Sequence, residues 1–261
     1  MRHTFRRRST YRWAAAAVAM VAVAASASIG TNARHIPAAL DPVPYGPLSP
    51  VASQSVTGPA TPPPLMPARP NCAVDACVAL TFDDGPDRRT TSRLLDILQQ
   101  KGATATFFIV GNRIAGNEDI LERMTQLGMQ VENHTWDHPN LTHLAQDSAV
   151  YQIKTTTDAI SRTTGRAPRY LRPPAGSWLP GVTPTDGLTV ALWDVDPLDW
   201  MYRDRTTVIA NTLSAVKPQS IILLHDIYPT TIDAVPGILD GLKLRGLTPA
   251  TLDDLLNSTD G

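Results

Sequence analysis

Two pairs of ionisable side chains in this sequence have the spacing of catalytic or metal-binding groups. Asp83 and Asp84 stand side by side after an apolar run, and His134 and His138 lie four residues apart. Two histidines at this spacing can face one point from a helical turn or a tight loop. With Asp84 they form a set that holds a divalent metal and leaves a position open for water. Asp83 is then free to act as a base, although the Asp-Gly-Pro string that follows is also good turn chemistry.

Three further polar clusters follow later in the chain. They are Arg172 to Gly176 (RPPAG), Asp194 to Trp200 (DVDPLDW) and Leu223 to Asp226 (LLHD). A histidine with a carboxylate partner, as at His225, can serve as a general acid that its partner keeps protonated. Hydrolysis of an N-acetyl amide needs an activated water, charge relief on the tetrahedral oxyanion and a proton for the leaving nitrogen. The clusters contain groups for each of these tasks.

The residues between the clusters predict alternating strands and helices. Short apolar runs predict strands at 78–82, 105–110, 129–131, 170–171, 188–193 and 220–224. Helical periodicity predicts helices at 91–101, 120–127, 144–164, 206–216 and 232–244. This alternation predicts an α/β fold with a parallel sheet. Because each polar cluster follows a strand, and the carboxyl ends of parallel strands meet on one rim, we expect the clusters to converge there.

The order of these motifs resembles that of the NodB-homology polysaccharide deacetylases, also called carbohydrate esterase family 4. The resemblance rests on the string TFDDGP at 81–86 together with His-Thr-Trp-Asp-His at 134–138, and it covers most of residues 78–256. It implies a distorted (β/α) barrel with the active site at the carboxyl rim of its parallel strands. It also implies a metal-dependent hydrolase that removes N-acetyl groups from N-acetylglucosamine-containing polysaccharide and releases acetate.

The resemblance assigns roles to the base and the metal ligands. Asp83 is expected to be the catalytic base that takes a proton from the attacking water, held ionised and oriented by Arg172. Asp84, His134 and His138 are expected to bind the metal. Zinc is the expected ion because a carboxylate and two imidazoles suit it, and cobalt or another divalent ion can replace it.

The resemblance also assigns the acid and the substrate contacts. His225 is expected to protonate the leaving amine, with Asp199 tuning it. The backbone amide of Ala175 is expected to stabilise the oxyanion, and Trp200 and Leu223 to line the pocket for the acetyl methyl group.

Two features depart from the family pattern. Ala175 stands where the family often has tyrosine, a change that keeps the backbone donor but removes a ring that can pack against the sugar. Residues 177–187 are short and rich in Pro and Gly where the family usually has a helix. We therefore expect the barrel to lack a helix there and to have an open or distorted flank.

The N-terminal residues predict export. Residues 1–33 contain five arginines and no acid ahead of an apolar stretch at 14–25, and small residues follow, which is the order of a secretory signal peptide. The apolar stretch is shorter than the ~20 residues that span a bilayer, although an uncleaved anchor is the alternative. Residues 34–71 hold eleven of the 23 prolines and predict an extended linker. Residues 72–261 are expected to form the catalytic domain of a secreted or cell-envelope protein.

Cysteine content and charge limit the remaining possibilities. Cys72 and Cys77 are the only cysteines, and in an exported protein such a pair is expected to form a disulfide, since a metal site would need further thiolates or histidines nearby. The chain has 23 Lys and Arg against 24 Asp and Glu, which argues against a nucleic-acid partner. Loss of the five arginines of residues 1–33 leaves 18 basic against 24 acidic side chains. We expect a monomer without a protein partner.

The expected substrate is an N-acetylated polysaccharide, with peptidoglycan first and chitin-type oligomers second. One alternative is an O-acetyl esterase acting on xylan with the same residues. The other is a catalytically inactive glycan-binding module, which is disfavoured because the proposed base, metal ligands and acid are all present.

Overall fold

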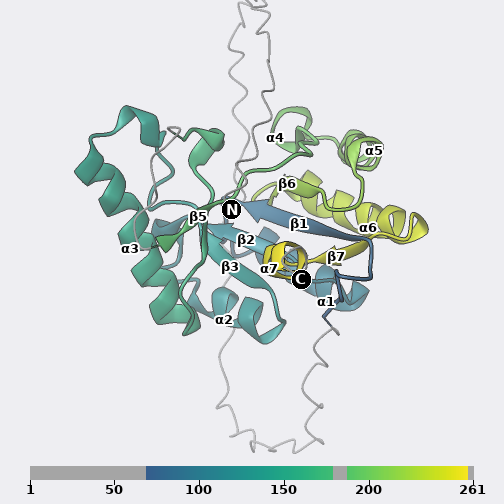
Figure 1. Ribbon diagram of the computed structural model, residues 1–261, viewed down its shortest axis with the longest axis horizontal. Coiled ribbons are helices and arrows are strands. Elements are labelled where there is room, and N and C mark those ends of the chain that lie inside the picture. The colour runs from purple at the N-terminus through teal and green to yellow at the C-terminus, as the bar shows by residue number, and fades with distance from the viewer. Residues whose placement is uncertain (1–68, 179–186, 258–261) are drawn as a thin grey trace, which may run out of the picture. The chain divides into compact units, whose positions relative to one another are not determined.

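The computed structural model describes residues 69–178 and 187–257 (Figure 1). The predicted signal peptide at 1–33, nearly all of the predicted linker and most of segment 177–187 lie outside the described residues. The expectations for these segments, including a missing helix after residue 177, therefore stay predictions. Among the helices within the described ranges, none combines the length and apolar character needed to cross a membrane.

The centre of the described domain is a sheet of seven parallel strands. Six of them lie in the order β5 (Thr189–Val190), β4 (Tyr170–Leu171), β3 (Gln130–Asn133), β2 (Thr106–Ile109), β1 (Cys77–Asp83) and β6 (Ile221–His225). β7 (Thr248–Ala250) pairs with the first residues of β1, on the edge opposite β6. Beyond β5 the chain returns to β6, where Val195 forms an isolated bridge with Ile222. This bridge brings the two ends of the sheet together, which confirms the predicted distorted barrel.

The alternation of side chains along β1 explains how one face of the sheet packs in the apolar core while the other face contributes to the candidate site. All seven residues of the strand are buried. Val78, Leu80 and Phe82 pack in the large apolar cluster shared with the surrounding helices. The intervening side chains point to the opposite face, because successive residues of a strand alternate. That face carries Thr81 and Asp83, so the inner side of the barrel becomes polar towards the carboxyl end of the strand.

Helices cover the outer face of the sheet (Figure 1). They are α1 (Thr90–Lys101), α2 (Glu118–Gln126), α3 (Gln146–Thr164), α5 (Arg205–Ala215) and α6 (Pro229–Leu244). Their apolar residues, such as Leu94 of α1 and Leu121 of α2, belong to the same cluster as the outward-facing strand residues. Helix α1 ends at Gly102, which takes the left-handed conformation that a residue without a Cβ adopts at low cost.

One end of the barrel interior is filled by the C-terminal helix α7 (Leu252–Asn257). Leu252 and Leu255 join a second apolar cluster with the inward-facing residues Ala79 and Phe108. Cys72 and Cys77 also belong to this cluster and form the predicted disulfide. With this end filled, the polar rim at the other end is the part of the barrel that faces solvent.

The structure corrects one predicted strand and adds elements that the sequence did not indicate. The strand expected at 188–193 is only Thr189–Val190 long. It ends early because the carbonyl oxygens of Ala191 and Leu192 accept hydrogen bonds from the Arg172 side chain instead of from a strand neighbour. The elements not predicted are β7, α7 and the short helix α4 (Asp199–Tyr202), together with the 3₁₀ turns η1 (Gly111–Arg113), η2 (Leu141–His143) and η3 (Pro174–Gly176).

Candidate active site

The predicted catalytic and metal-binding side chains converge on the carboxyl rim of the barrel. Asp83 ends β1 and Asp84 follows it, while His225 ends the neighbouring strand β6. His134 follows β3, and Arg172 follows β4. In the sheet β4 lies beside β3 and β1 beside β6, with only β2 between the two pairs, so residues spread over more than 140 positions of sequence share one site.

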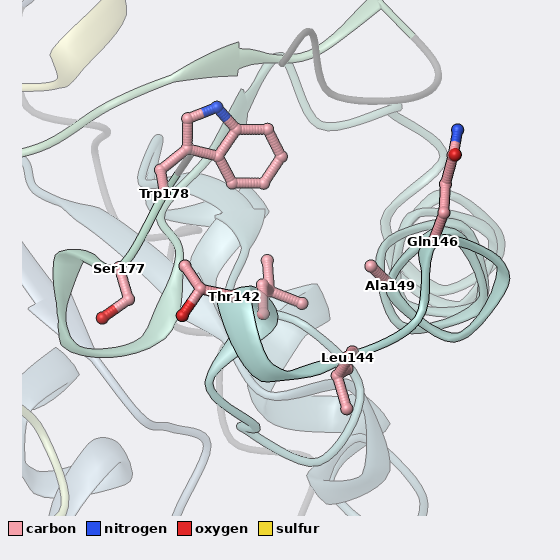
Figure 2. A pocket seen from close by; sticks show the side chains of 7 residues that line it. Thr142, Leu144, Gln146, Ala149, Ser177 and Trp178 are labelled. Carbon is pink, nitrogen blue, oxygen red and sulfur yellow. The ribbon is translucent and has the colours of Figure 1, made fainter. Parts of the chain in front are cut away.

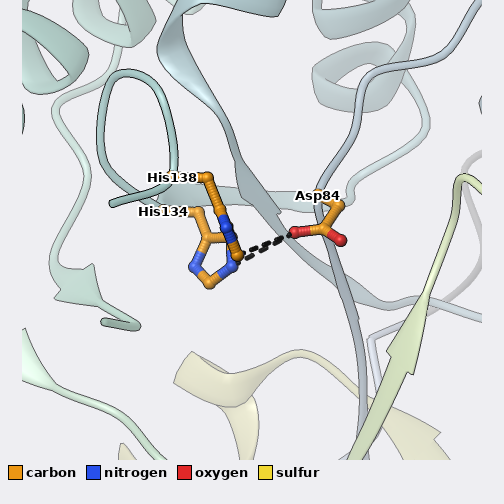
Figure 3. A group of neighbouring side chains, drawn as sticks. All are labelled: Asp84, His134 and His138. Carbon is orange, nitrogen blue, oxygen red and sulfur yellow. Dashed lines mark ion pairs between the residues drawn. The ribbon is translucent and has the colours of Figure 1, made fainter. Parts of the chain in front are cut away.

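Asp84, His134 and His138 form a cluster that fits a metal ion (Figure 3). We call these three residues the metal trio. Asp84 Oδ1 lies 3.4 Å from His134 Nε2 and 3.2 Å from His138 Nε2, and the ligand atoms all lie within 4.8 Å of one another. Asp84 Oδ1 is buried and accepts no hydrogen bond from the described residues. A buried carboxylate oxygen left without a donor and facing two imidazole nitrogens is the arrangement that a divalent cation satisfies.

The two histidines reach the metal trio from a tight loop and not from a helix. Thr135 and His138 both have positive φ angles, of 70° and 61°, which bend the loop back on itself. Asn133 Oδ1 accepts a hydrogen bond from the Thr135 amide at 2.8 Å. Gln152 Oε1, on α3, accepts from the amides of the next two residues at 2.9 and 3.0 Å. These side chains supply the acceptors that a helix would otherwise provide.

Hydrogen bonding and charge prepare the metal trio for a cation. His134 Nδ1 lies 2.6 Å from the carbonyl oxygen of Arg172, so Nδ1 carries the proton and Nε2 presents its lone pair to the site. Burial is the largest cause that lowers the pKa of His138, which favours the neutral ring that binds a metal. Burial alone would raise the pKa of Asp84, but His134, His225 and His138 more than offset this and lower it to about 2.

The predicted base is held by a fully buried arginine. Arg172 Nη1 donates to Asp83 Oδ1 at 2.8 Å and to Thr81 Oγ1 at 2.7 Å. The guanidinium also stacks over the Phe108 ring, with Cζ 4.0 Å from its centroid. Asp83 Oδ2 remains on the side of the metal trio, 3.8 Å from His134 Nε2. One carboxylate oxygen is thus fixed by Arg172 while the other faces the metal trio.

The predicted acid is paired with Asp199. His225 Nδ1 lies 2.8 Å from Asp199 Oδ1, and the His225 amide donates to Asp199 Oδ2 at 2.9 Å. Thr231 Oγ1 donates to the same Oδ2 at 2.7 Å. Burial lowers the pKa of His225, but the hydrogen bond and charge of Asp199 raise it to about 9. A proton on the remaining ring nitrogen is therefore available near neutral pH.

Comparison with known proteins identifies the arrangement. The family model described as polysaccharide deacetylase matches residues 71–185. The peptidoglycan-N-acetylmuramic acid deacetylase PdaC of Bacillus subtilis is 39% identical over 178 residues, which is 68% of this chain and 38% of that protein. A chitooligosaccharide deacetylase of Bradyrhizobium is 38% identical over 156 residues, 58% of this chain and 71% of that protein. The solved structure of PdaC superposes with a TM-score of 0.69 at 37% identity, covering 72% of this chain and 93% of that one.

The chain belongs to the polysaccharide deacetylase family. The family is metal-dependent, and the metal trio has the residues to bind such an ion. Several of the curated relatives are much longer proteins: the chain spans 38% of PdaC and 41% of a Listeria monocytogenes peptidoglycan-N-acetylglucosamine deacetylase.

The structure also locates the residues for which the family resemblance predicts substrate contacts. Ala175 lies in η3 with φ 54°, a left-handed conformation unusual for a residue with a side chain. Leu223 precedes His225 by two residues on β6, so the two side chains share the inner face, and Leu223 is buried. Trp200, in α4 next to Asp199, is 43% exposed at the rim. Their roles in this family member stay predictions.

Two supporting positions, Thr81 and Thr231, were not singled out from sequence. Thr81 connects Arg172 to the barrel wall, and Thr231 holds Asp199 from α6. Asp226, the neighbour of His225, looks like its carboxylate partner in sequence, but its side chain points to the other side, where it accepts from Thr91 Oγ1 at 2.6 Å. The alternation of side chains along a strand could have indicated this from sequence, because adjacent residues point to opposite faces.

A cavity of about 270 Å³ lies beside the loops that follow β3 and β4 (Figure 2). Its walls are mainly apolar, and the Trp178 ring faces it from the segment after η3. On the other side lie Gln146 and Ala149, in the first turn of α3, and Leu144 lies on the loop that leads into this helix. The cavity is thus built by the continuations of the two loops that carry His138 and Ala175.

Proposed function

We propose that this protein is a metal-dependent N-deacetylase that hydrolyses N-acetyl groups of peptidoglycan or chitin-type oligomers and releases acetate. The observation that carries the proposal is that two groups able to transfer protons, Asp83 and His225, lie at the metal trio and are held by different partners. Asp83 is fixed by Arg172, and His225 is fixed by Asp199. Such a pair suits cleavage of an amide, which needs a base for the water and an acid for the amine.

In this proposal each residue has one task. A divalent metal held by Asp84, His134 and His138 would polarise the acetyl carbonyl and lower the pKa of water in the site. Asp83 accepts the proton of the attacking water at Oδ2, because Oδ1 is engaged by Arg172. His225 donates a proton from Nε2 to the leaving nitrogen, because Nδ1 is bound to Asp199. The Ala175 amide faces the oxyanion, and Trp200 and Leu223 enclose the methyl group.

Zinc is the ion we propose for the metal trio. Two imidazole nitrogens and one carboxylate oxygen are a ligand set that zinc prefers in hydrolytic sites. Cobalt fits the same set, because imidazole and carboxylate ligands also bind other divalent first-row metal ions.

We further propose that the protein is exported and works as a monomer outside the cytoplasm. The basic and apolar order of residues 1–33 supports export. The Cys72–Cys77 disulfide supports it independently, since disulfides persist in oxidising compartments. In this proposal residues 34–71 form a linker, and residues 72–261 form the catalytic domain.

Acetate release by the purified full-length chain tests the function. The substrates are peptidoglycan, N-acetylchitotetraose and acetylxylan, each with and without a chelator. We expect chelator-sensitive release from the two N-acetyl substrates. Release from acetylxylan alone would favour the O-acetyl esterase, and metal binding without release from any substrate would favour an inactive glycan-binding module.

A further inference from the structure

An exposed arginine, Arg203, lies beside the predicted general acid. The guanidinium carbon of Arg203 lies 3.2 Å from the centroid of the Tyr228 ring. The centroid of that ring is in turn 5.6 Å from the centroid of the His225 ring. Arg203 is exposed, and no carboxylate of residues 69–178 or 187–257 forms an ion pair with it.

The backbone around Arg203 holds it in this place. Helix α4 is bounded by Leu198 and Arg203, both left-handed, with φ angles of 60° and 49°. Few residues other than glycine adopt this conformation, so the backbone is locally strained at both positions. Arg203 Nε donates to the carbonyl oxygen of Trp200 at 2.8 Å, and the stack on Tyr228 orients the guanidinium plane. The neighbouring Asp204 is turned away, since it accepts from the Thr207 amide as the cap of α5.

Two arginines on this side of the site, Arg203 and Arg113, form no ion pair with a carboxylate of the described residues. The carboxylate of Asp199 is engaged by His225, and that of Asp83 by Arg172. Arg113 adds a second cation: it donates to the Asp84 carbonyl oxygen at 2.8 Å and pairs with no carboxylate of the described residues. Burial raises the pKa of the Tyr228 hydroxyl, the charges of Asp84 and Asp199 raise it further, and those of Arg203 and Arg113 lower it.

We propose that Arg203, held on Tyr228, binds a carboxylate of the substrate glycan. A planar guanidinium donates two parallel hydrogen bonds to a carboxylate, and a guanidinium already held in place loses little entropy on binding. The site therefore selects N-acetyl sugars that carry a carboxylate or adjoin one. The lactyl ether of muramic acid is such a group, because it is attached to the carbon next to the acetamido carbon. This inference rests on the proposed deacetylase function and specifies its substrate class.

Comparing activity on neutral and acidic glycans distinguishes carboxylate binding by Arg203 from a purely structural role of this residue. The acidic substrate is peptidoglycan glycan from which an amidase has removed the stem peptides, leaving free lactyl carboxylates. The neutral substrate is N-acetylchitotetraose. The measurement is kcat/KM for acetate release by the zinc-loaded full-length chain and by Arg203→Gln, Arg203→Lys and Arg162→Gln. Arg162 is an exposed arginine of α3, so its variant changes the net charge equally but far from the rim.

The expected result is a change in the ratio of kcat/KM between the two substrates. Arg203→Gln lowers the ratio of acidic to neutral substrate about tenfold, because a charged hydrogen-bonded pair is lost. Arg203→Lys keeps the charge without the planar fork and gives an intermediate ratio. Raising the salt concentration lowers the wild-type ratio towards that of Arg203→Gln, and Arg162→Gln keeps the wild-type ratio.

Other results would overturn the inference. If Arg203→Gln lowered kcat/KM equally on both substrates, Arg203 would only support the fold of α4. If the wild type acted on N-acetylchitotetraose but preferred it to the acidic glycan, the deacetylase would stand and the carboxylate site would not. If the wild type released no acetate from either substrate, the proposed function would fail as well.

Discussion

Arg172 and Asp83 form a buried ion pair with an N–O distance of 2.8 Å, and the arginine side chain is completely inaccessible to solvent. Besides Asp83, the guanidinium donates to Thr81 and to the carbonyl oxygens of Ala191 and Leu192, which follow β5. Burial lowers the pKa of Arg172, and the charge of Asp83 opposes that effect. The pair thus connects β1, β4 and the segment after β5, and fixes the predicted base in the middle of them.

This pair predicts an asymmetric response to mutation. Arg172→Met leaves the Asp83 carboxylate buried without a cation, which is expected to lower the free energy of unfolding by about 3–5 kcal/mol. The double variant Arg172→Met, Asp83→Asn buries a neutral amide instead and is expected to recover part of that loss. Urea unfolding followed by circular dichroism gives both values. A double variant as unstable as Arg172→Met would show that the ion pair is not the cause.

His225 is predicted to matter more for an amide than for an activated ester. An amine leaves poorly unless it is protonated, whereas a phenolate leaving group of an aryl acetate needs no proton. His225→Ala should therefore lower kcat/KM on N-acetylchitotetraose about 100-fold or more, and on 4-nitrophenyl acetate much less. Equal losses on both substrates would argue against a general-acid role.

The partner of His225 sets the alkaline limit of activity. Burial lowers the pKa of His225 and Asp199 raises it to about 9, so the protonated acid is lost as the pH rises through about 9. Asp199→Asn removes the raising charge but not the burial. The pKa of His225 then falls, and the alkaline limb of the kcat/KM profile moves to lower pH. A matched control is Asp194→Asn, whose carboxylate accepts from the Ile221 amide instead. An unchanged limb in Asp199→Asn would contradict the pairing.

Gly85 is predicted to be irreplaceable because the side chain of Asp226, which directly follows β6, lies against it. A Cβ at this position would overlap the carboxylate of Asp226, whose side chain is fully buried. Gly85→Ala is expected to displace the turn that carries Asp84, lowering zinc affinity and the melting temperature. Asp226→Ala in the same chain removes the overlap and should restore part of both. Wild-type zinc affinity in Gly85→Ala, measured by titration calorimetry, would rule the overlap out.

The sequence predicted the barrel and the members of the metal trio, and the family resemblance also predicted the pairings of Asp83 with Arg172 and of His225 with Asp199, which the structure shows. The apolar runs predict most strands within a few residues, since buried parallel strands are continuously apolar. The strand at 188–193 is shorter than predicted because Arg172 takes its carbonyl oxygens, a contact between residues about twenty positions apart. The pairing of Asp199 with His225 bridges 26 positions and was expected only from the family resemblance, since the local sequence points to Asp226 instead.

Helix α4 shows a second limit of the sequence. Its two boundary residues, Leu198 and Arg203, take left-handed conformations without being glycine, and nothing in their type indicates this. Tertiary contacts of the site, such as the stack of Arg203 on Tyr228, hold them there. The residues that depart from local preference are therefore those at the rim where substrate is expected to bind.

Metal content and turnover of the Asp83→Asn and His134→Ala variants test the central claim most directly. Asp83 is predicted to be the base and not a ligand, and the amide oxygen of asparagine can still accept from Arg172. Asp83→Asn should therefore retain about one zinc per chain while acetate release from N-acetylchitotetraose falls at least 100-fold. His134→Ala should lose both zinc and activity. Wild-type turnover in Asp83→Asn, or full zinc content in His134→Ala, would contradict the assignment of base and ligand.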